Sequence, residues 1–326
     1  MRPYLRPLMQ VGPAAPDDAQ RFGMCWFTHV EVLSRGAAPQ IIPVSDLSDA
    51  ERARFASARM DQALMGILNT TPDSFSDGGQ FAEVAQAVAH GHAVIGAGAA
   101  ILDIGGESTR PGAQTVAIDA EVLRTAPVIA ALRGAGIKTP ISIDTRKAAV
   151  AEAALDAGAT IVNDVSGFTY DTDLAPLCAA RGVPVCVMHA QGDPQTMQQN
   201  PSYENVVLDV YDFLAGRIAF LTAIGIPRHN IIADPGIGFG KTLDHNLAIL
   251  NRISLFHGLG VPILLGASRK RFIGTIGNTP DANDRAPGSI AVALAAMAQG
   301  VQIIRAHDVA DHAQAIALWR ASVAHP

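Results

Sequence analysis

Three polar side chains end short apolar runs at Asp144, Asn163 and Asp234, and their types suit the binding of a polar heterocycle. Two carboxylates can accept N–H donors from an aminopyrimidine-like edge and can stabilise a positive charge that forms on it. A lone aspartate at the end of a strand is as often the cap of the helix that follows. Three such groups at one mouth favour ligand recognition over capping.

Basic residues gather after the last two apolar runs. Arg269, Lys270 and Arg271 lie in GASRKRFIG, and Arg305 and His307 lie in IIRAHD. In a barrel of parallel strands the loops after strands 7 and 8 often bind phosphate, so this cluster predicts a phosphorylated substrate. A solvated basic turn is the alternative for SRKR alone. An arginine at the end of a buried strand, in contrast, needs a partner.

Other motifs carry weaker signals. The segment 234–241, DPGIGFGK, resembles a glycine-rich nucleotide loop but lacks the first glycine of a P-loop at the required spacing. Its glycines are expected to let the backbone approach a ligand closely. His189, in VMHAQG, is expected near the site, either as a structural hydrogen-bonding residue or as a base. His90 and His92 lack partners for a zinc site.

The elements that must position these residues form an eightfold repeat. Eight apolar runs, each followed by a polar tip and most by a predicted helix, end at Asn69, Asp103, Asp144, Asn163, His189, Asp234, Ser268 and His307. This order predicts an α/β protein with a (β/α)8 TIM barrel, whose strands open at their carboxyl ends onto the face that carries the active site.

The predicted elements follow from the apolar runs. We expect strands at 63–69, 100–104, 141–144, 160–164, 183–189, 230–234, 262–267 and 301–306, near-continuously apolar because both faces are buried. We expect helices at 81–95, from 118, and at 147–156, 203–224, 243–256, 288–299 and 309–323. Long loops after strands 1, 2 and 5 are expected to be functional, and the first two to act as lids over the mouth.

The segment before the first barrel strand has a different character. We divide the chain into an N-terminal extension, 1–62, and the barrel, 63–326. Within the extension, alternation predicts a strand over 25–33, and a serine-capped pattern predicts a short helix within 45–59. We expect the extension to pack on the base or the side of the barrel.

Composition limits the class of protein. The chain has 326 residues, 49% of them hydrophobic, and a net charge of −6, which argues against a nucleic-acid partner. The three cysteines, Cys25, Cys178 and Cys186, form no C-x-x-C pair and are read as reduced thiols. The N-terminal residues contain no apolar run long enough for a signal peptide or membrane span. We therefore expect a cytoplasmic protein without membrane contact.

Taken together, the motifs resemble those of the dihydropteroate synthases of the pterin-binding barrel family. The resemblance rests on GILNTTPDSFSDGG, DIGGESTRPGA, SIDT, VNDVSG, VMHAQGDPQTMQ, DPGIGFGKT, GASRK and IIRAHD, which occur in family order and spacing from about residue 64 to 321. It says nothing about the N-terminal extension. It implies condensation of 6-hydroxymethyl-7,8-dihydropterin pyrophosphate with p-aminobenzoate to give 7,8-dihydropteroate and pyrophosphate in folate biosynthesis. It also implies a homodimer and a target of sulfonamides.

The resemblance implies a role for each matched residue. The pterin would contact Asp144, Asn163, Met188, Asp234 and Lys270. The pyrophosphate would contact Asn69, Thr109, Arg110, Arg305 and His307, with Mg²⁺ bound by Asn69. The p-aminobenzoate would lie near Phe75, Pro111, Phe239 and Ser268. The catalytic residues would be Asp144, Asp234, Lys270, Arg305 and His307, which would stabilise a cationic pterin and the departing anion.

Two other functions use part of the same pattern. A methyltetrahydrofolate:corrinoid methyltransferase would share the pterin-contacting Asp, Asn and Asp but would not need the TTPDSF and STRPG loops or the Arg305 and His307 anion site. A non-catalytic pterin-binding homologue that acts through a partner would have no need of a pyrophosphate site. Release of pyrophosphate that depends on p-aminobenzoate separates the three.

Overall fold

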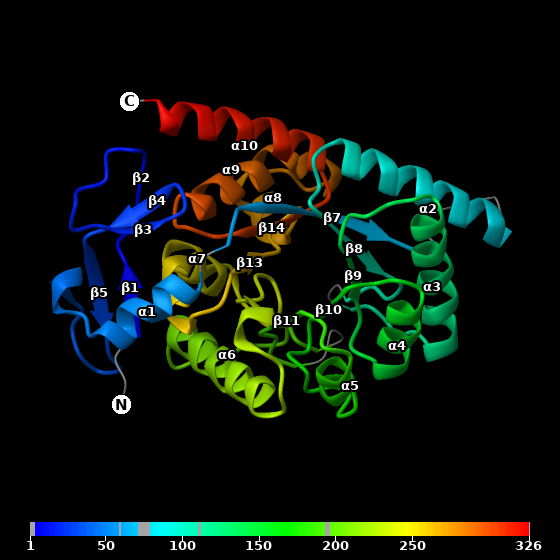
Figure 1. The fold of residues 1–326 in the computed structure, drawn as a ribbon, viewed down its shortest axis with the longest axis horizontal. Coiled ribbons are helices and arrows are strands. Elements are labelled where there is room, and N and C mark those ends of the chain that lie inside the picture. Colours follow the sequence, from blue (N-terminus) through cyan, green and yellow to red (C-terminus); the bar gives the residue numbers. More distant parts are fainter. Residues whose placement is uncertain (1–3, 59, 71–78, 110–111, 193–195, 326) are drawn as a thin grey trace.

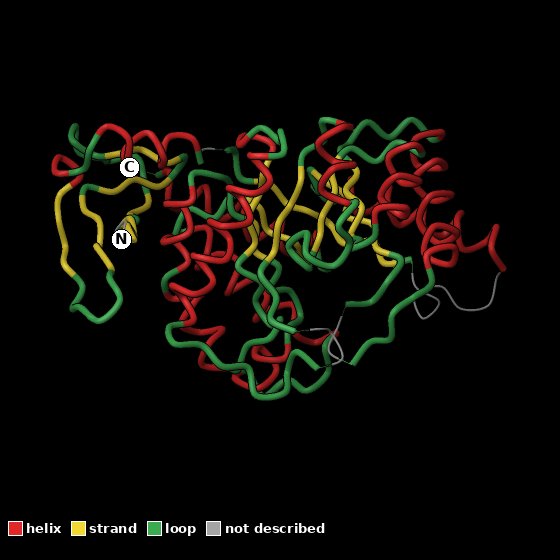
Figure 2. Tube along the Cα trace, turned by 90° about the horizontal axis from the view of Figure 1, so that it is seen from below, coloured by secondary structure: helices red, strands yellow, loops and turns green. Residues whose placement is uncertain are grey.

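Eight parallel strands form a ring with helices outside it, and a strand-rich N-terminal extension lies at one side (Figure 1). The computed structural model describes residues 4–58, 60–70, 79–109, 112–192 and 196–325 of the chain. This architecture is the predicted (β/α)8 barrel. In Figure 2 the barrel strands lie at the centre, surrounded by helices, and the extension stands beside them.

The barrel strands pair in the order of the chain. They are β7 (Ala63–Asn69), β8 (Ile101–Gly105), β9 (Ile141–Asp144), β10 (Ile161–Asp164), β11 (Val185–Met188), β12 (Ile231–Asp234), β13 (Leu264–Leu265) and β14 (Ile303–Ala306). A parallel bridge between Ala233 and Ile263 joins β12 to the start of the β13 segment and closes the ring. Each strand lies within two residues of its predicted bounds, although only two residues of the seventh are regular.

The helices agree with the repeat, with two additions. They are α2 (Gly79–Gly96), α3 (Ile118–Gly134), α4 (Ala148–Asp156), α5 (Leu174–Arg181), α6 (Val206–Ala223), α7 (Leu243–Asn251), α8 (Arg271–Ile276), α9 (Ala286–Met297) and α10 (Val309–Ala324). The short helices α5 and α8 were not predicted. In α5, Pro176 lies in the first turn, where its missing N–H is not needed. The helix expected to reach residue 256 ends at Asn251, and a 3₁₀ segment, η4 (Ile253–Leu259), continues the chain.

The interior of the barrel holds one compact apolar layer. Seven of the eight strands each contribute a buried side chain to it: Met65, Ile101, Ile161, Cys186, Ile232, Leu264 and Ile303. A larger apolar cluster fills the space between the strands and the surrounding helices. Strands buried on both faces explain why the sequence runs are apolar throughout. The interior layer fills the barrel below its mouth, as in a packed barrel core.

The extension folds into two small antiparallel sheets and a helix. One sheet contains β1 (Tyr4–Pro7), β5 (His29–Leu33) and β6 (Gln40–Pro43), and the other contains β2 (Gln10–Val11), β3 (Gln20–Phe22) and β4 (Cys25–Phe27). The strand predicted over 25–33 was therefore wrong in one respect, because it is two strands that belong to different sheets. The predicted helix is α1 (Asp49–Ser57), and it begins with a capping box between Ser48 and Glu51.

The extension contacts the barrel at the end opposite the mouth. Ser254 Oγ donates to the carbonyl of Pro7 at 3.0 Å, and Gln302 Nε2 donates to the carbonyl of Ala58 at 2.7 Å. Both barrel residues precede a strand and so lie at the base. All three cysteines are buried free thiols. Among the described residues, no helix has the length and apolar character needed to cross a membrane.

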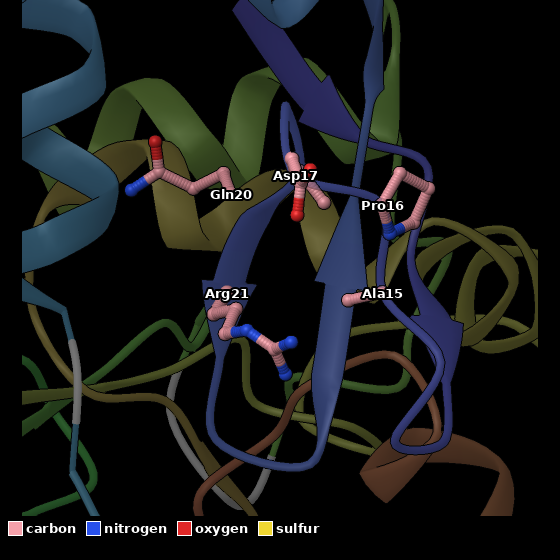
Figure 3. Close-up of a pocket in the computed structure, with 6 residues that line it drawn as sticks. Ala15, Pro16, Asp17, Gln20 and Arg21 are labelled. Atoms are coloured by element: carbon pink, nitrogen blue, oxygen red, sulfur yellow. The ribbon is translucent and has the colours of Figure 1, made fainter.

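A shallow surface hollow lies on the extension itself. It is lined by residues between Ala15 and Arg21, as Figure 3 shows. No residue of the barrel lines it. The chemistry discussed below therefore lies elsewhere, at the mouth of the barrel.

Candidate active site

A polar layer lies directly above the apolar layer inside the barrel. Five of its six members come two residues after a member of the apolar layer on the same strand, and the sixth, Asp144, comes two residues after Ser142. Side chains two residues apart on a strand point to the same face. The layer consists of Asp103, Asp144, Asn163, Met188, Asp234 and Arg305. The strand register therefore brings together residues that lie far apart in the chain.

Arg305 lies between two buried aspartates. Its Nε atom donates to Asp103 Oδ2 at 2.5 Å, and its Nη2 atom donates to Asp144 Oδ2 at 2.8 Å. Asn163 Nδ2 donates to the same Asp103 oxygen at 3.2 Å. The sequence assigned Arg305 to the pyrophosphate and Asp144 to the pterin, whereas here the two side chains are in direct contact. Asp103 was missed, although its alternation with Ile101 in ILDIG could have found it.

Two acceptors in this layer remain open. The Oδ1 atoms of Asp103 and Asp144 are buried and have no hydrogen-bond partner among the described residues. Burial raises the pKa of Asp144 to about 7; Arg305 opposes this shift and Asp103 adds to it. Buried acceptors without a partner are uncommon, and they mark a place where a ligand can donate. The arrangement suits a ligand that brings its own N–H groups.

Asp234 is the third buried carboxylate of this layer. Gly236 N donates to Asp234 Oδ1 at 2.7 Å. Burial raises the pKa of Asp234 to about 6, and the Gly236 hydrogen bond opposes this shift. A Cβ atom on Gly266 would lie 3.5 Å from Asp234 Oδ2, in ordinary van der Waals contact, so Gly266 borders this carboxylate.

The loops after β11 and β12 are packed backbone against backbone. A Cβ atom on Gly236 would lie 1.9 Å from the carbonyl oxygen of His189, and one on Gly240 would lie 2.5 Å from that of Gln191. Both glycines have positive φ angles, 69° and 62°. They are needed for contact between two loops, which corrects the expectation that they let the backbone approach a ligand.

Lys241 stabilises the glycine-rich loop through contacts of its buried Nζ atom. Its Nζ atom donates to the carbonyls of Gly236 at 2.8 Å and Phe239 at 3.0 Å, and it lies 2.9 Å from His189 Nδ1. Burial lowers the pKa of Lys241 to about 7. Burial, together with the charge of Lys241, lowers the pKa of His189 to about 2. His189 is therefore a neutral structural partner of Lys241 and is not a base.

The other predicted residues surround this layer at the mouth. Lys270 Nζ lies 4.0 Å above the ring centre of Phe239. Ser268 Oγ and His307 Nδ1 are 3.1 Å apart, so a residue assigned to p-aminobenzoate and one assigned to pyrophosphate are in contact. Asn69, the last residue of β7, has its Oδ1 atom 3.9 Å from where a Cβ atom on Gly105 would lie.

Four assigned residues belong to the loops after β7 and β8. Thr109 is half-buried at the end of a described stretch. Phe75, Arg110 and Pro111 lie outside the described residues, as does most of the loop after β7 that was expected to act as a lid. Their predicted roles stay predictions.

A second cluster of charges, which the sequence did not indicate, anchors the loop after β8. Lys147 Nζ contacts Glu107, Glu121 Oε2 at 2.5 Å and the carbonyl of Val116 at 2.7 Å. Arg146 Nη2 donates to Glu107 Oε1 at 2.6 Å, and Val116 N donates to Glu107 Oε2 at 3.0 Å. All four charged side chains are buried. Both ends of the loop that carries Thr109 are therefore fixed by one balanced set of charges.

Metal ligands are scarce in the part of the chain that the structure describes. No group of three or more His, Cys, Asp or Glu residues there is arranged to hold a metal ion. The amide of Asn69 offers a hard oxygen at the mouth, the type of ligand that Mg²⁺ prefers. One such oxygen does not form a preformed cage, so a metal would have to share its ligands with a substrate.

Comparisons with known proteins identify the family. A family model described as pterin binding enzyme matches residues 65–307. The chain is 45% identical over 261 residues to a dihydropteroate synthase of Synechocystis, covering 79% of this chain and 90% of the relative.

Solved structures give the same result. A Xanthomonas albilineans dihydropteroate synthase with 4-aminobenzoic acid has a TM-score of 0.76 and 42% identity, and covers 82% of this chain and 94% of that chain. A structure of the same enzyme in complex with 7,8-dihydropteroate has a TM-score of 0.74 and 39% identity, with coverage of 82% and 95%.

Proposed function

The chain belongs to the pterin-binding enzyme family and is a dihydropteroate synthase, and from that premise we propose how its barrel mouth joins a pterin to 4-aminobenzoate. The observation that carries the proposal is the pair of buried, unpartnered carboxylate oxygens on Asp103 and Asp144 beside Arg305. A dihydropterin brings several N–H donors on one edge, and this layer offers acceptors with charge.

The pterin occupies the polar layer inside the barrel. Asp144, Asn163 and Asp234 receive its donor edge, Met188 lines the slot, and Lys270 closes it. This placement is supported by the strand order. Asp144, Asn163, Met188 and Asp234 come from adjacent strands, and their side chains point to one interior face. We add Asp103 to this set because it orients both Arg305 and Asn163.

The pyrophosphate lies nearer the rim of the mouth. Asn69, Thr109, Arg110, Arg305 and His307 would contact it, and Asn69 is the residue that would hold Mg²⁺. When bound, the metal supplies positive charge against the leaving group. Arg305 contacts Asp144. From this position Arg305 can orient the carboxylate that binds the pterin and can also stabilise the negative charge of the departing pyrophosphate.

The 4-aminobenzoate approaches from the side of Phe239 and Ser268, with Phe75 and Pro111 completing its pocket. The bond between the pterin methylene carbon and the pyrophosphate oxygen breaks, and the electron pair leaves with the pyrophosphate. The carboxylates of Asp144 and Asp234 stabilise the cationic pterin that remains. The amine nitrogen then forms the new C–N bond and releases a proton. Water must be kept out, because it would trap the same cation.

One assay tests the proposal directly. The purified protein, given 6-hydroxymethyl-7,8-dihydropterin pyrophosphate, Mg²⁺ and 4-aminobenzoate, should release pyrophosphate and form 7,8-dihydropteroate. Omission of 4-aminobenzoate or Mg²⁺ should stop release. Methyl transfer to a corrinoid, or pterin binding without turnover, would support the other two functions. Tight binding of Mg²⁺ to the ligand-free protein would contradict a metal shared with substrate.

Asp234→Asn should keep the fold and weaken the binding of a pterin analogue by about 10- to 100-fold, because hydrogen bonds to a charged acceptor contribute about 1.5–3 kcal/mol. The amide can still accept from Gly236 N but carries no charge. Calorimetric titration measures the loss. Affinity of the wild type should also fall as the pH drops through about 6, where Asp234 takes up a proton.

The same substitution should not lower stability at pH 8. The folded-state pKa of Asp234, about 6, lies above the ordinary value of 3.8, so stability falls as the pH rises between these values, and the ionised carboxylate destabilises the fold fully above about 6. The asparagine removes this cost. Asp156→Asn on the outer helix α4 is the control, with unchanged pterin affinity expected. Equal affinities of the Asp234 variant and the wild type would remove Asp234 from the site.

Three further features of the enzyme are proposals: the division of the chain rests on the change in sequence character before residue 63, the location on the N-terminal composition, and the homodimer on the family. The extension 1–62 and the barrel 63–326 are separate units of the chain, the protein forms a homodimer, and it acts in the cytoplasm on small-molecule substrates. Gel filtration with light scattering tests the homodimer.

A further inference from the structure

The N-terminal extension extends from the barrel base along the flank of helix α6. Tyr4, on β1, donates its hydroxyl to Asp212 Oδ2 at 2.8 Å. Arg35, in the turn between β5 and β6, lies 2.7 Å from Asp209 Oδ1 through Nη1 and 2.8 Å from Asp212 Oδ2 through Nη2. Both aspartates lie in the first two turns of α6, which begins at the mouth end of the barrel. The extension thus contacts an element that leads directly from an active-site loop.

Asp209 connects Arg35 to the end of the loop after β11. One oxygen, Oδ1, faces Arg35, while the other, Oδ2, accepts from the backbone N–H groups of Glu204 at 3.0 Å and Asn205 at 3.1 Å. Asn205 in turn caps α6 by accepting from Leu208 N. Because a carboxylate is planar, fixing one oxygen orients the other. Arg35 therefore orients the carboxylate that holds the last residues of this loop.

The next residue back along the loop supports the aminobenzoate side of the site. Tyr203 donates its hydroxyl to the carbonyl of Gly240 at 2.7 Å, and its ring meets His245 edge-on at 5.0 Å. Gly240 follows Phe239, the residue under Lys270. Gln198, from the same loop, donates to the carbonyl of Gly238 at 2.6 Å. Phe239 is therefore held on both sides by the loop that Asp209 fixes.

From these contacts we propose that Arg35 is a positioning residue for 4-aminobenzoate, acting through Asp209 and Tyr203 on the backbone around Phe239. The inference rests on the proposed function, because it assumes that Phe239 borders the aminobenzoate. It assigns a role to the extension, which lies before the start of the matched family model at residue 65. Arg35 contacts neither substrate.

The size of the expected effect follows from the exposure of the ion pairs. The Arg35 side chain is 22% exposed, and the side chains of Asp209 and Asp212 are 25% and 50% exposed, and solvent-accessible pairs contribute about 0–1 kcal/mol to stability. Loss of Arg35 should therefore not unfold the protein. A small displacement of a substrate-positioning group, in contrast, can lower the rate substantially.

The test compares Arg35→Met with Arg181→Met in the full chain. Arg181 also pairs with two acidic residues, Asp156 and Glu152, but on helix α5, away from both loops. We expect Arg35→Met to raise the KM for 4-aminobenzoate about three- to tenfold, with the KM for the pterin pyrophosphate within about twofold of wild type. Arg181→Met should change neither. An equal rise in both KM values, or no rise, overturns the inference.

A double-mutant cycle tests the path. Tyr203→Phe removes the hydroxyl that reaches Gly240, so it should raise the KM for 4-aminobenzoate by itself. If Arg35 acts through Tyr203, Arg35→Met should add little in the Tyr203→Phe background. Independent, multiplicative effects would overturn the path. A wild-type protein without aminobenzoate-dependent turnover would refute the proposed function, whereas an active wild type with an unaffected Arg35 variant refutes this inference alone.

Discussion

Arg305→Met should lower kcat/KM by about a hundredfold to a thousandfold, or about 2.7–4 kcal/mol, because it removes one preorganised donor to the charge that develops on the leaving group. Arg305 is the cation between Asp103 and Asp144, both buried. Without it two neighbouring carboxylates face each other inside the barrel. The pKa of Asp144, already about 7, should rise further, so that Asp144 is protonated at neutral pH and cannot bind the pterin as an anion.

The pH dependence distinguishes this mechanism from a simple loss of contact. A carboxyl whose folded-state pKa lies above its unfolded value takes up a proton on folding, so its destabilising effect weakens as the pH falls. The Arg305 variant should therefore be less destabilised at pH 5 than at pH 8, as measured by chemical denaturation. Its pterin affinity should fall at a higher pH than that of the wild type. A pH-independent loss would contradict the expectation.

A matched control is available on the outside of the barrel. Arg133 donates to the carbonyls of Gly158, Ile137 and Thr139 near the barrel base. Arg133→Met removes the same charge and should lower stability. It should leave pterin affinity unchanged, because no ligand group lies at that end.

Lys147→Met should lower the free energy of unfolding by about 3–5 kcal/mol, because it leaves two buried glutamates with one arginine. Glu107 shows how the cluster works. Burial alone would raise its pKa, but hydrogen bonds from Lys147, Val116 and Arg146 hold the pKa below its usual value. The loop after β8 also loses the bond from Lys147 to the Val116 carbonyl. The rate of turnover of the pterin pyrophosphate should fall by a larger factor than the affinity for a pterin that lacks pyrophosphate.

The double variant Lys147→Met/Glu121→Gln tests the charge argument. It restores charge balance in the cluster, so part of the lost stability should return. Thr145 can still donate to the amide oxygen at position 121. Lys138→Met, at an exposed position, is the control and should be neutral within about 0.5 kcal/mol. Additive losses in the double variant would show that packing, rather than charge, holds the loop.

The sequence by itself determined the barrel and the composition of its mouth. A strand buried on both faces is a short apolar run, and a polar residue at its carboxyl end must lie at the mouth of a parallel barrel. Asp144, Asn163 and Asp234 could therefore be assigned to one site before any contact was known. The helix at Ser48 could also be predicted, because a capping box is a local signal.

Only the tertiary structure decided which of these residues pair. Arg305 lies 161 residues from Asp144 and 202 from Asp103, and no local pattern carries a contact over that distance. The same holds for Lys147 and Glu107. Each follows a predicted strand, and no local pattern indicates that the two side chains are in contact. Most charged residues in a sequence are exposed to solvent in the fold. The register of the strands decides which of them are buried, and a buried charge requires a partner.

The roles of the glycines and of the extension were also decided by packing. Gly236 and Gly240 are indistinguishable in sequence from glycines that face a ligand, yet each faces a carbonyl of the neighbouring loop. Residues 25–33 alternate as one strand, yet they divide at Thr28 because their two halves pair with different partners. A strand's own residues set its faces, but its partners are supplied by the rest of the fold.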